Sequence, residues 1–243
     1  MPLDDLAAIS AYGVTGIGEV RPGDDVGALL AEALGPPPAS VLRDGDVVVV
    51  TQKIVSKAEG RLVPVDHGDP RAKRALVEAE SVRVLRRRAD LLITETRHGF
   101  VCANAGVDLS NVADGWAALL PLDPDRSARR IRAEIGRRLC VTVGVVISDT
   151  FGRTWRQGVT DVAIGVAGIA AVVDLRGTMD ATGRELVATQ VCVADELASA
   201  AELVMGKDRH IPAAVIRGVP AAWLRDGSAM TEIVRGPAED LFR

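Results

Sequence analysis

Short apolar runs, rich in valine and isoleucine, recur along the chain and predict buried strands. Each run is flanked by a charged residue, glycine or proline, and the runs occupy residues 46–50, 91–94, 141–148 and 212–218. Uninterrupted apolar runs are typical of strands that are covered on both faces, whereas half-exposed strands alternate. Residues 100–103 predict a hairpin partner for 91–94, with His98 and Gly99 at the turn.

Two Asp-Pro pairs predict the starts of helices. Aspartate is a strong N-cap residue, and proline fits the first helical position because its missing N–H would be unpaired there in any case. The pair at 69–70 predicts a helix to about residue 88, and the pair at 123–124 predicts a helix to about residue 138. The inward positions of the first helix would be Ala72, Leu76, Ala79 and Leu85.

A third helix is predicted over residues 185–205, which are rich in alanine, leucine, valine and glutamate, with Gly206 as its stop. Part of this stretch, residues 186–193, is also β-branched and fits a strand. Strands outnumber clean β-α-β alternation, so the predicted fold class is α+β, or mixed α/β, with mixed and antiparallel sheets and flanking helices. Residues 1–243 would form one domain, or two closely packed subdomains.

Composition and charge narrow the class of protein. The 243 residues are 48% hydrophobic but only 3% aromatic, so the core must be built from aliphatic side chains. The net charge of −4 gives no general reason to expect nucleic acid as a partner. No apolar run approaches the length of a membrane span, and the chain starts acidic where a signal peptide would be basic. Three widely spaced cysteines argue against a disulfide framework, so a cytoplasmic protein is expected.

The run at 141–148 ends in an acid and a hydroxyl, Asp149 and Thr150, followed by a loop with Arg153 and Arg156. A carboxylate held at the end of a buried strand suits a hard divalent cation, which prefers oxygen ligands and often shares them with nucleotide phosphates. Guanidinium groups suit phosphate or carboxylate. The alternative is a strand that Asp149 caps at a turn, followed by solvated arginines.

Two further polar segments follow predicted strands. Residues 104–111 carry Asp108 between asparagines, and residues 51–60 carry Lys53 and Lys57. Each has a simpler interpretation, because asparagine and aspartate commonly make turns and lysines commonly cover a solvated turn. Three such segments after three buried strands together predict one site, because strand ends are rigid and can bring sequence-distant groups together. Acidic metal ligands would face basic phosphate ligands there.

Several familiar sites are absent from the sequence. There is no Gly-x-x-x-x-Gly-Lys-[Ser/Thr] phosphate loop, and Gly16-Ile17-Gly18 is followed three residues on by Arg21, so the dinucleotide fingerprint fails. The three histidines have no ligand spacing. The arginines between 126 and 138 predict a solvated helix face or, alternatively, electrostatic attraction of an anionic substrate.

Four strings of residues resemble the coenzyme F420-0:γ-glutamyl ligase family in their order and spacing. They are Ser-Lys-Ala-Glu-Gly-Arg at 56–61, Asn-Ala-Gly-Val-Asp with Ser-Asn at 104–111, Ile-Ser-Asp-Thr-Phe-Gly-Arg at 147–153 and Val-Ala-Asp-Glu-Leu at 193–197. The similarity extends from about Gly16 to about Arg217. Residues 236–242 look like the linker of the actinobacterial two-domain version, in which a nitroreductase-like, flavin-binding domain follows.

The resemblance implies a ligase of coenzyme F420 biosynthesis that depends on GTP and on Mn²⁺ or Mg²⁺, with K⁺ as a further candidate. It would add L-glutamate through γ-linkages to the deazaflavin coenzyme F420-0 and would form an intertwined homodimer. Asp108 and Asp149 are expected to bind one metal ion, and Thr150 to help bind a second. The residues expected around GTP are Ile17, Gly18, Glu19, Val20, Gln52, Lys53, Lys57, Asn111 and the segment 205–211, with Met205, Gly206, Lys207 and Asp208.

The mechanism that we expect has two steps. The lactyl carboxylate of F420-0 would attack the γ-phosphate of GTP to give an acyl phosphate and GDP, and the α-amine of glutamate would then displace phosphate. Lys57 and Asp149 are the candidate catalytic residues at the transferring group. Arg153 and Arg156 are the candidates for the carboxylates of F420-0 or glutamate, because guanidinium binds carboxylate in a bidentate manner.

One residue departs from the archaeal members of this family, in which an acid expected to bind the second metal stands where this chain has Lys207. A protonated lysine cannot ligate a cation, so Asp208 takes over, the second site is altered, or Lys207 contacts phosphate instead. Two other functions stay open. One is amino-acid ligation to another carboxylate acceptor, and the other is a non-catalytic module that holds F420 for a partner reductase.

Overall fold

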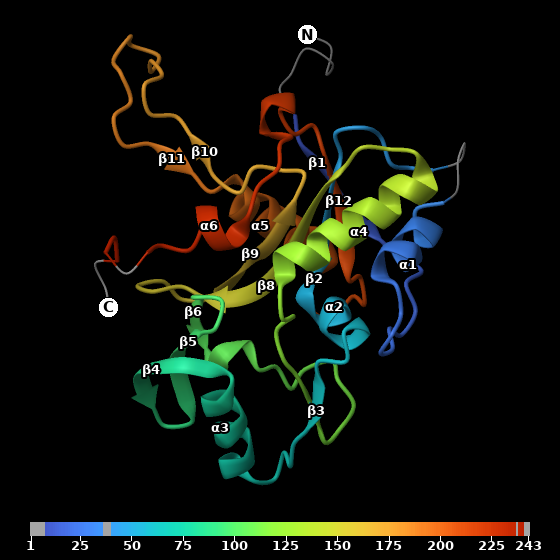
Figure 1. The fold of residues 1–243 in the computed structure, drawn as a ribbon, viewed down its shortest axis with the longest axis vertical. Coiled ribbons are helices and arrows are strands. Elements are labelled where there is room, and N and C mark those ends of the chain that lie inside the picture. The colour runs from blue at the N-terminus through green and yellow to red at the C-terminus, as the bar shows by residue number, and fades with distance from the viewer. Residues whose placement is uncertain (1–7, 36–39, 237, 241–243) are drawn as a thin grey trace.

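The computed structural model describes residues 8–35, 40–236 and 238–240. The acidic first residues and parts of the linker-like segment at 236–242 lie outside the described residues. A five-stranded sheet forms the centre, with helices packed against both faces (Figure 1). Within this sheet β2 and β8 are parallel and all other neighbours are antiparallel, so the sheet is mixed, as predicted. Its strands, in spatial order, are β1 (Ser10–Val14), β12 (Ala213–Arg217), β2 (Val47–Thr51), β8 (Gly144–Gly152) and β9 (Val159–Ala167).

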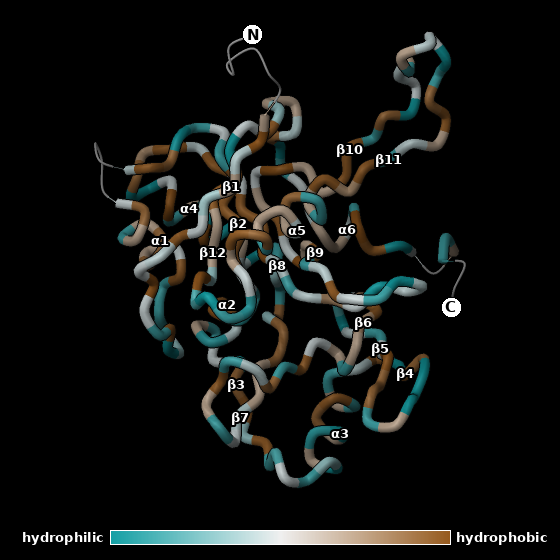
Figure 2. The backbone as a smooth tube through the Cα atoms, turned by 180° about the vertical axis from the view of Figure 1, so that it is seen from behind, coloured by the Kyte–Doolittle hydropathy of each residue, from teal (hydrophilic) through white to brown (hydrophobic). Residues whose placement is uncertain are grey.

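Strand β2 is buried on both faces, which explains its uninterrupted valines. Its four valines are 0% exposed and alternate between two hydrophobic clusters. One cluster joins β2 to α1 (Val26–Ala33) and α4 (Pro124–Leu139), and the other joins it to α5 (Val193–Met205). Figure 2 shows the strands at the centre as predominantly hydrophobic. Helix α4 begins at the predicted Asp-Pro pair, where the Asp123 side chain accepts a hydrogen bond from the Arg126 N–H.

Residues 62–118 form a smaller part beside the central sheet, with a hydrophobic cluster of their own (Figure 1). All strand pairs within this part are antiparallel, and β6 pairs with β5 as the predicted hairpin. The elements of this part are β3 (Leu62–Pro64), α3 (Pro70–Ala79), β4 (Ser81–Arg88), β5 (Leu91–Thr96), β6 (Val101–Ala103), the 3-10 turn η2 (Asn104–Gly106) and β7 (Trp116–Ala118).

The helix predicted over 70–88 is wrong in its second half. Helix α3 ends at Ala79, which is exposed, and residues 81–88 form strand β4. This segment has three β-branched or aliphatic residues among arginines, a composition that suits an edge strand. As a strand it pairs with β5, whose edge would stay unpaired if the segment were helical. An ion pair across the two strands also favours the pairing of β4 with β5, because Arg83 Nη2 lies 2.9 Å from Glu95 Oε2.

The helix predicted over 185–205 is also too long. Helix α5 begins only at Val193, although it does end before Gly206, whose φ of 61° lies in the left-handed region. The preceding residues belong to an arm that projects from the molecule (Figure 1). At its base β10 (Val173–Asp174) pairs with β11 (Gln190–Val191), so the alternative strand interpretation holds for only two residues. Beyond that pair most side chains of the arm are exposed, including Val187.

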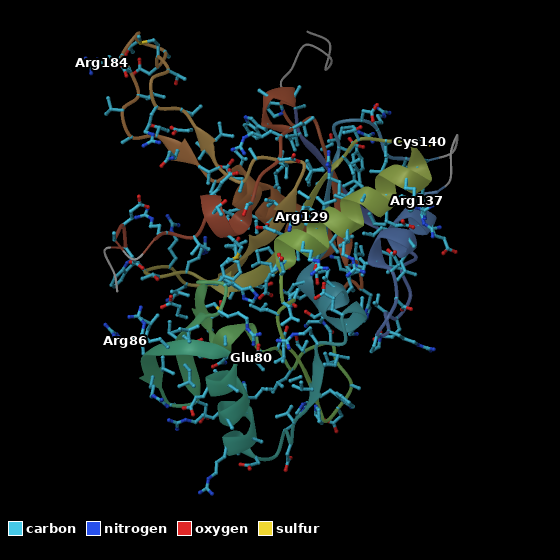
Figure 3. The ribbon with its side chains drawn as sticks, viewed as in Figure 1. Glu80, Arg86, Arg129, Arg137, Cys140 and Arg184 are labelled. Carbon is cyan, nitrogen blue, oxygen red and sulfur yellow. The ribbon has the colours of Figure 1, made fainter. Side chains whose placement is uncertain are left out.

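The remaining helical elements are short. Helix α2 (Gln52–Ala58) follows β2 without a loop, and η3 (Ala221–Trp223) and α6 (Ala229–Glu232) follow β12. The arginines of α4 are mostly exposed, as predicted, and Arg129 and Arg137 can be seen along it (Figure 3). None of the helices in the described ranges has the length and apolar character needed to cross a bilayer.

Gly165 sets the approach of α4 to β9, and its replacement by alanine should destabilise the fold. A Cβ there would lie 2.5 Å from the carbonyl carbon and oxygen of Pro124, and backbone cannot move aside as a flexible side chain can. We expect Gly165→Ala to lose about 1–3 kcal/mol of unfolding free energy in urea denaturation. Gly152→Ala, on the same hairpin but with nothing within 4 Å, should stay close to the parent.

His98 should make stability fall in mild acid. Its ring is buried, its Nε2 lies 3.1 Å from the carbonyl oxygen of Leu122, and its Nδ1 has no partner among the described residues. Burial lowers the pKa of His98 below its usual value, so the unfolded chain takes up a proton more readily. The contribution of neutral His98 to the free energy of unfolding is therefore fully present above about pH 6.5. Below that pH the contribution declines by at most about 1.4 kcal/mol per pH unit, until the pH falls below the pKa of His98 in the folded state.

The measurement is the difference in unfolding free energy between the parent and His98→Gln from pH 7.5 to 5, which removes contributions from other titrating groups. The difference should shrink as the pH falls. A constant difference for His98→Gln would contradict the assignment.

Candidate functional site

A cavity of about 750 Å³ opens at one end of the central strands. Segments from six places in the chain line it, and β2 ends there, at Thr51, beside the middle of the parallel strand β8. The lining segments are the loop before α1 (17–20), the β2–α2 junction (51–54 and 57), the loop before β7 (108–113), the middle of β8 (148–150), Asp161 of β9, and the end of α5 with its following loop (202–212).

The lysines enter the cavity because α2 starts where β2 ends. Thr51 is the last residue of the strand and the N-cap of the helix, and its hydroxyl oxygen accepts a hydrogen bond from the Lys53 N–H at 3.2 Å. Lys53 and Lys57 lie one turn apart and so share a helix face. Their side chains are 14% and 11% exposed, so the cavity has two nearly buried positive charges.

Each of these lysines is held by a carboxylate. Lys53 Nζ lies 2.6 Å from Asp108 Oδ2, and Lys57 Nζ lies 2.5 Å from Glu19 Oε1. Burial raises the pKa of Asp108, but hydrogen bonds from Lys53 and Ser110 outweigh it and hold this pKa below its ordinary value. Asp108 is therefore charged at neutral pH and balances the charge of Lys53.

The carboxylates on β8 and β9 form the other side of the cavity. Strand β8 runs on to Gly152 instead of ending at Asp149, so Asp149 and Thr150 lie within the ladder and not at a turn. Burial, together with the nearby negative charges of Asp108 and Asp161, raises the pKa of Asp149 to about 7. Asp149 therefore lies within electrostatic reach of two other carboxylates, Asp108 and Asp161.

Asp161 was not predicted from the sequence as part of the site. It is 3% exposed, and it accepts hydrogen bonds from Ser148 Oγ at 2.9 Å and from Thr150 Oγ1 at 2.5 Å. The signal was present as one acid inside the apolar run of β9, but it becomes interpretable only when the β8–β9 register places Thr150 opposite Asp161. Glu202, on the last turn of α5, also lines the cavity and was missed.

Most residues that were predicted for the site line this one cavity. The predicted residues that do not line it are Arg153, Arg156, Asp208 and Arg209. Arg153 and Arg156 lie exposed in the loop at 153–158 that joins β8 to β9, beside Trp155, which is 88% exposed. The predicted residues that do line the cavity are Ile17, Gly18, Glu19, Val20, Gln52, Lys53, Lys57, Asp108, Asn111, Asp149, Thr150, Met205, Gly206 and Lys207.

The side chain of Lys207 points toward Thr150 in the cavity wall. Its ammonium donates a hydrogen bond to Thr150 Oγ1 and lies 3.9 Å from Asp161 Oδ1. Asp208, the residue that could have replaced it as a ligand, is exposed and does not line the cavity. A positive charge therefore stands where the resemblance implied a second metal ion.

As the side chains stand, no three histidine, cysteine, aspartate or glutamate residues in the described ranges are grouped to hold a metal ion. The donor set still suits a hard cation, because carboxylate and hydroxyl oxygens are the ligands that Mg²⁺ and Mn²⁺ prefer. A cation among Asp108, Asp149 and Thr150 would also relieve the repulsion that raises the pKa of Asp149. These residues therefore fit a metal ion once Asp108 is released from Lys53.

A mixed α+β fold with opposed lysines and carboxylates in one polar cavity is typical of an enzyme that handles an anionic substrate. Residues 16–218 match the family described as F420-0:Gamma-glutamyl ligase. This match covers most of the chain, and the chain therefore belongs to the F420-0:γ-glutamyl ligase family and is a ligase.

Individual relatives agree with the family match. Coenzyme F420:L-glutamate ligase of Methanothermobacter thermautotrophicus is 44% identical over 250 residues, which cover 97% of this chain and 99% of that protein. The protein of the same name from Methanopyrus kandleri is 44% identical over 93% of this chain and 94% of its own length. That from Methanocaldococcus jannaschii is 39% identical over 83% of this chain and 86% of its own length.

Proposed function

We propose that this protein ligates L-glutamate through γ-linkages to coenzyme F420-0, with GTP as the phosphoryl donor, in coenzyme F420 biosynthesis. The observation that carries the proposal is the cavity in which Lys53, Lys57 and Lys207 face Asp108 and Asp149. Such a set can bind a polyphosphate and its cation together. The names of the relatives, which are coenzyme F420:L-glutamate ligases over nearly their whole length, support the choice of substrates.

Asp108, Asp149 and Thr150 would hold Mn²⁺ or Mg²⁺, and the ion would supply positive charge at the β- and γ-phosphates of the nucleotide. The lysines supply further charge from the protein itself. Lys57, nearly buried on α2, is suited to the transferring phosphoryl group, because it is a compact charge in a partly dry site. Lys207 is suited to a phosphate oxygen at the opposite wall, in keeping with the third alternative for this residue.

The proposed reaction has two bond exchanges. A lactyl carboxylate oxygen of F420-0 bonds to the γ-phosphorus of GTP as the bond to the β-γ bridging oxygen breaks, giving an acyl phosphate and GDP. The α-amine of glutamate then attacks the acyl carbon, loses a proton and expels inorganic phosphate. The role of Lys57 is to stabilise the charge on the equatorial phosphate oxygens.

The acceptor end of the substrate would extend from the cavity along the β8–β9 hairpin. Asp149 and Thr150 lie in the cavity wall, and the same hairpin carries Arg153 and Arg156 at its exposed end. The one hydrogen bond formed by the Arg153 side chain among the described residues goes to the Gln157 carbonyl oxygen at 3.3 Å, so its guanidinium is available to a carboxylate.

A homodimer is part of the proposal. The arm at 173–191 projects from the rest of the molecule and exposes Met179 at 66% and Val187 at 79% (Figure 1). Arg184 lies near its tip (Figure 3). An extended arm with exposed apolar side chains suits exchange of contacts with a second copy, which supports an intertwined arrangement.

The direct experiment incubates the protein with F420-0, L-glutamate, GTP and Mn²⁺ and analyses the products by mass spectrometry. A ladder of species spaced by one glutamyl residue, with equivalent GDP, is the expected result. Bound F420-0 without glutamate addition or GDP would favour the non-catalytic module. Turnover only when another carboxylate acceptor replaces F420-0 would favour the alternative ligase.

Asp149→Asn should keep the fold and lose activity by at least about 100-fold, because an amide is a weaker cation ligand than a carboxylate. Ligation rate and thermal unfolding are measured on the same preparation. Asp90→Asn, at the exposed turn between β4 and β5, is the matched control and should retain the parent rate. Near-normal turnover of Asp149→Asn would remove Asp149 from the metal site.

Arg153→Ala should raise the KM for one carboxylate substrate by about 10-fold, with a smaller change in kcat, because it removes substrate binding and not phosphate chemistry. Initial rates are measured with F420-0 and glutamate varied in turn. The exposed Arg71→Ala on α3 is the control for loss of one surface charge. If neither KM moves, Arg153 does not bind a substrate carboxylate.

A further inference from the structure

Every lysine of the cavity is already engaged by an oxygen atom of the cavity itself. Lys57 is paired with Glu19, and Lys207 with Thr150 and Asp161. Lys53 differs from the other two, because its partner Asp108 is one of the residues that fit a metal ion. The same carboxylate therefore has two candidate counter-ions, one built into α2 and one from solution.

The ammonium group of Lys53 and the carboxylate of Asp108 both have all of their polar atoms in hydrogen bonds. The ammonium donates to Asp108 Oδ2 at 2.6 Å, to the Ser110 carbonyl oxygen at 2.6 Å and to Ser110 Oγ at 2.9 Å, which uses all three of its hydrogens. Asp108 Oδ1 accepts a further hydrogen bond from the Ser110 N–H at 2.7 Å. Both carboxylate oxygens are thus occupied, and the loop at 108–110 is fixed on α2.

We propose that Lys53 is an exchangeable counter-ion: it holds Asp108 while the cavity is empty and moves to a phosphate group when nucleotide binds, which frees Asp108 for the divalent cation. This inference rests on the proposed function. It assigns to Lys53 a positioning role, in which the lysine couples the two ligands instead of touching the reacting atoms.

The sign of this coupling follows from charge. A divalent cation and an ammonium group at the same carboxylate oxygen repel each other, so the cation must displace Lys53 or bind weakly. A lysine withdrawn from its carboxylate into a partly buried site would be left unpaired, which is costly. A polyphosphate removes that cost by accepting the ammonium. Binding of the divalent cation therefore raises the affinity for the polyphosphate, and binding of the polyphosphate raises the affinity for the cation.

Lys53→Gln should accordingly change the two affinities in opposite directions. Without the ammonium, Asp108 is free, so Mn²⁺ should bind the nucleotide-free protein about 10-fold more tightly than it binds the parent. GTP in the presence of a chelator should bind about 10-fold more weakly, because one phosphate partner is gone. A merely structural role for Lys53 would weaken both. Mn²⁺ binding is measured by electron paramagnetic resonance of the free ion, and GTP binding by calorimetry.

The matched control is Lys57→Gln, which removes the same charge from the next turn of the same helix. Its partner is Glu19 and not Asp108, so it should weaken GTP while leaving Mn²⁺ affinity within about 2-fold. The double variant Lys53→Gln/Asp108→Asn should not show the tighter Mn²⁺ binding that is expected of Lys53→Gln alone. Lys53→Met, which has no amide to bond Asp108, provides a second test should Lys53→Gln unfold.

Unchanged or weaker Mn²⁺ binding by a folded Lys53 variant would overturn the exchange, as would equal tightening in Lys53→Gln and Lys57→Gln. Failure of the proposed function is recognised separately. Opposite shifts in the two affinities with no glutamate ligation would support the exchange and contradict the ligase reaction. Ligation with no such shifts would do the reverse.

Discussion

The complete burial of β2 is the constraint on which the rest of the structure depends. A strand covered on both faces can hold no charged side chain within its length, and it must pair along both edges to satisfy its backbone groups. It does so with β12 on one side and β8 on the other. Polar chemistry is thereby confined to the ends of the strand, and Thr51 begins α2 at once. The position of the lysines follows from the position of the valines.

The sequence was sufficient where one local preference decided the structure. The valine run of β2, the Asp-Pro caps of α3 and α4 and the glycine after α5 each specify their element, and they appear as predicted. Residues 81–88 and 185–192 failed because their composition permits helix and strand alike. In such segments the secondary structure depends on what the segment packs against. Residues 81–88 pair with β5, whereas residues 185–192 have no apolar partner among the described residues, and neither fact can be read from the segment itself.

The candidate site divides in the same way. Residues next to strand ends could be anticipated, because a change from apolar to polar side chains marks the place in the sequence. Asp161 could not, since its importance depends on a cross-strand register with Thr150. Arg153 and Arg156 were placed with the cavity on the assumption that β8 stops at Asp149. The strand continues to Gly152, which carries both guanidinium groups beyond the cavity lining.

The hydrogen bond between Thr150 and Asp161 has a consequence for how the cavity wall presents itself to a ligand. A threonine hydroxyl has one proton and two lone pairs, and a carboxylate buried behind it can only accept. The proton of Thr150 is therefore committed inward, and the hydroxyl oxygen turns its lone pairs outward. Asp161 thus makes the Thr150 hydroxyl a hydrogen-bond acceptor on its cavity side, and this side favours hydrogen-bond donors and cations over anions.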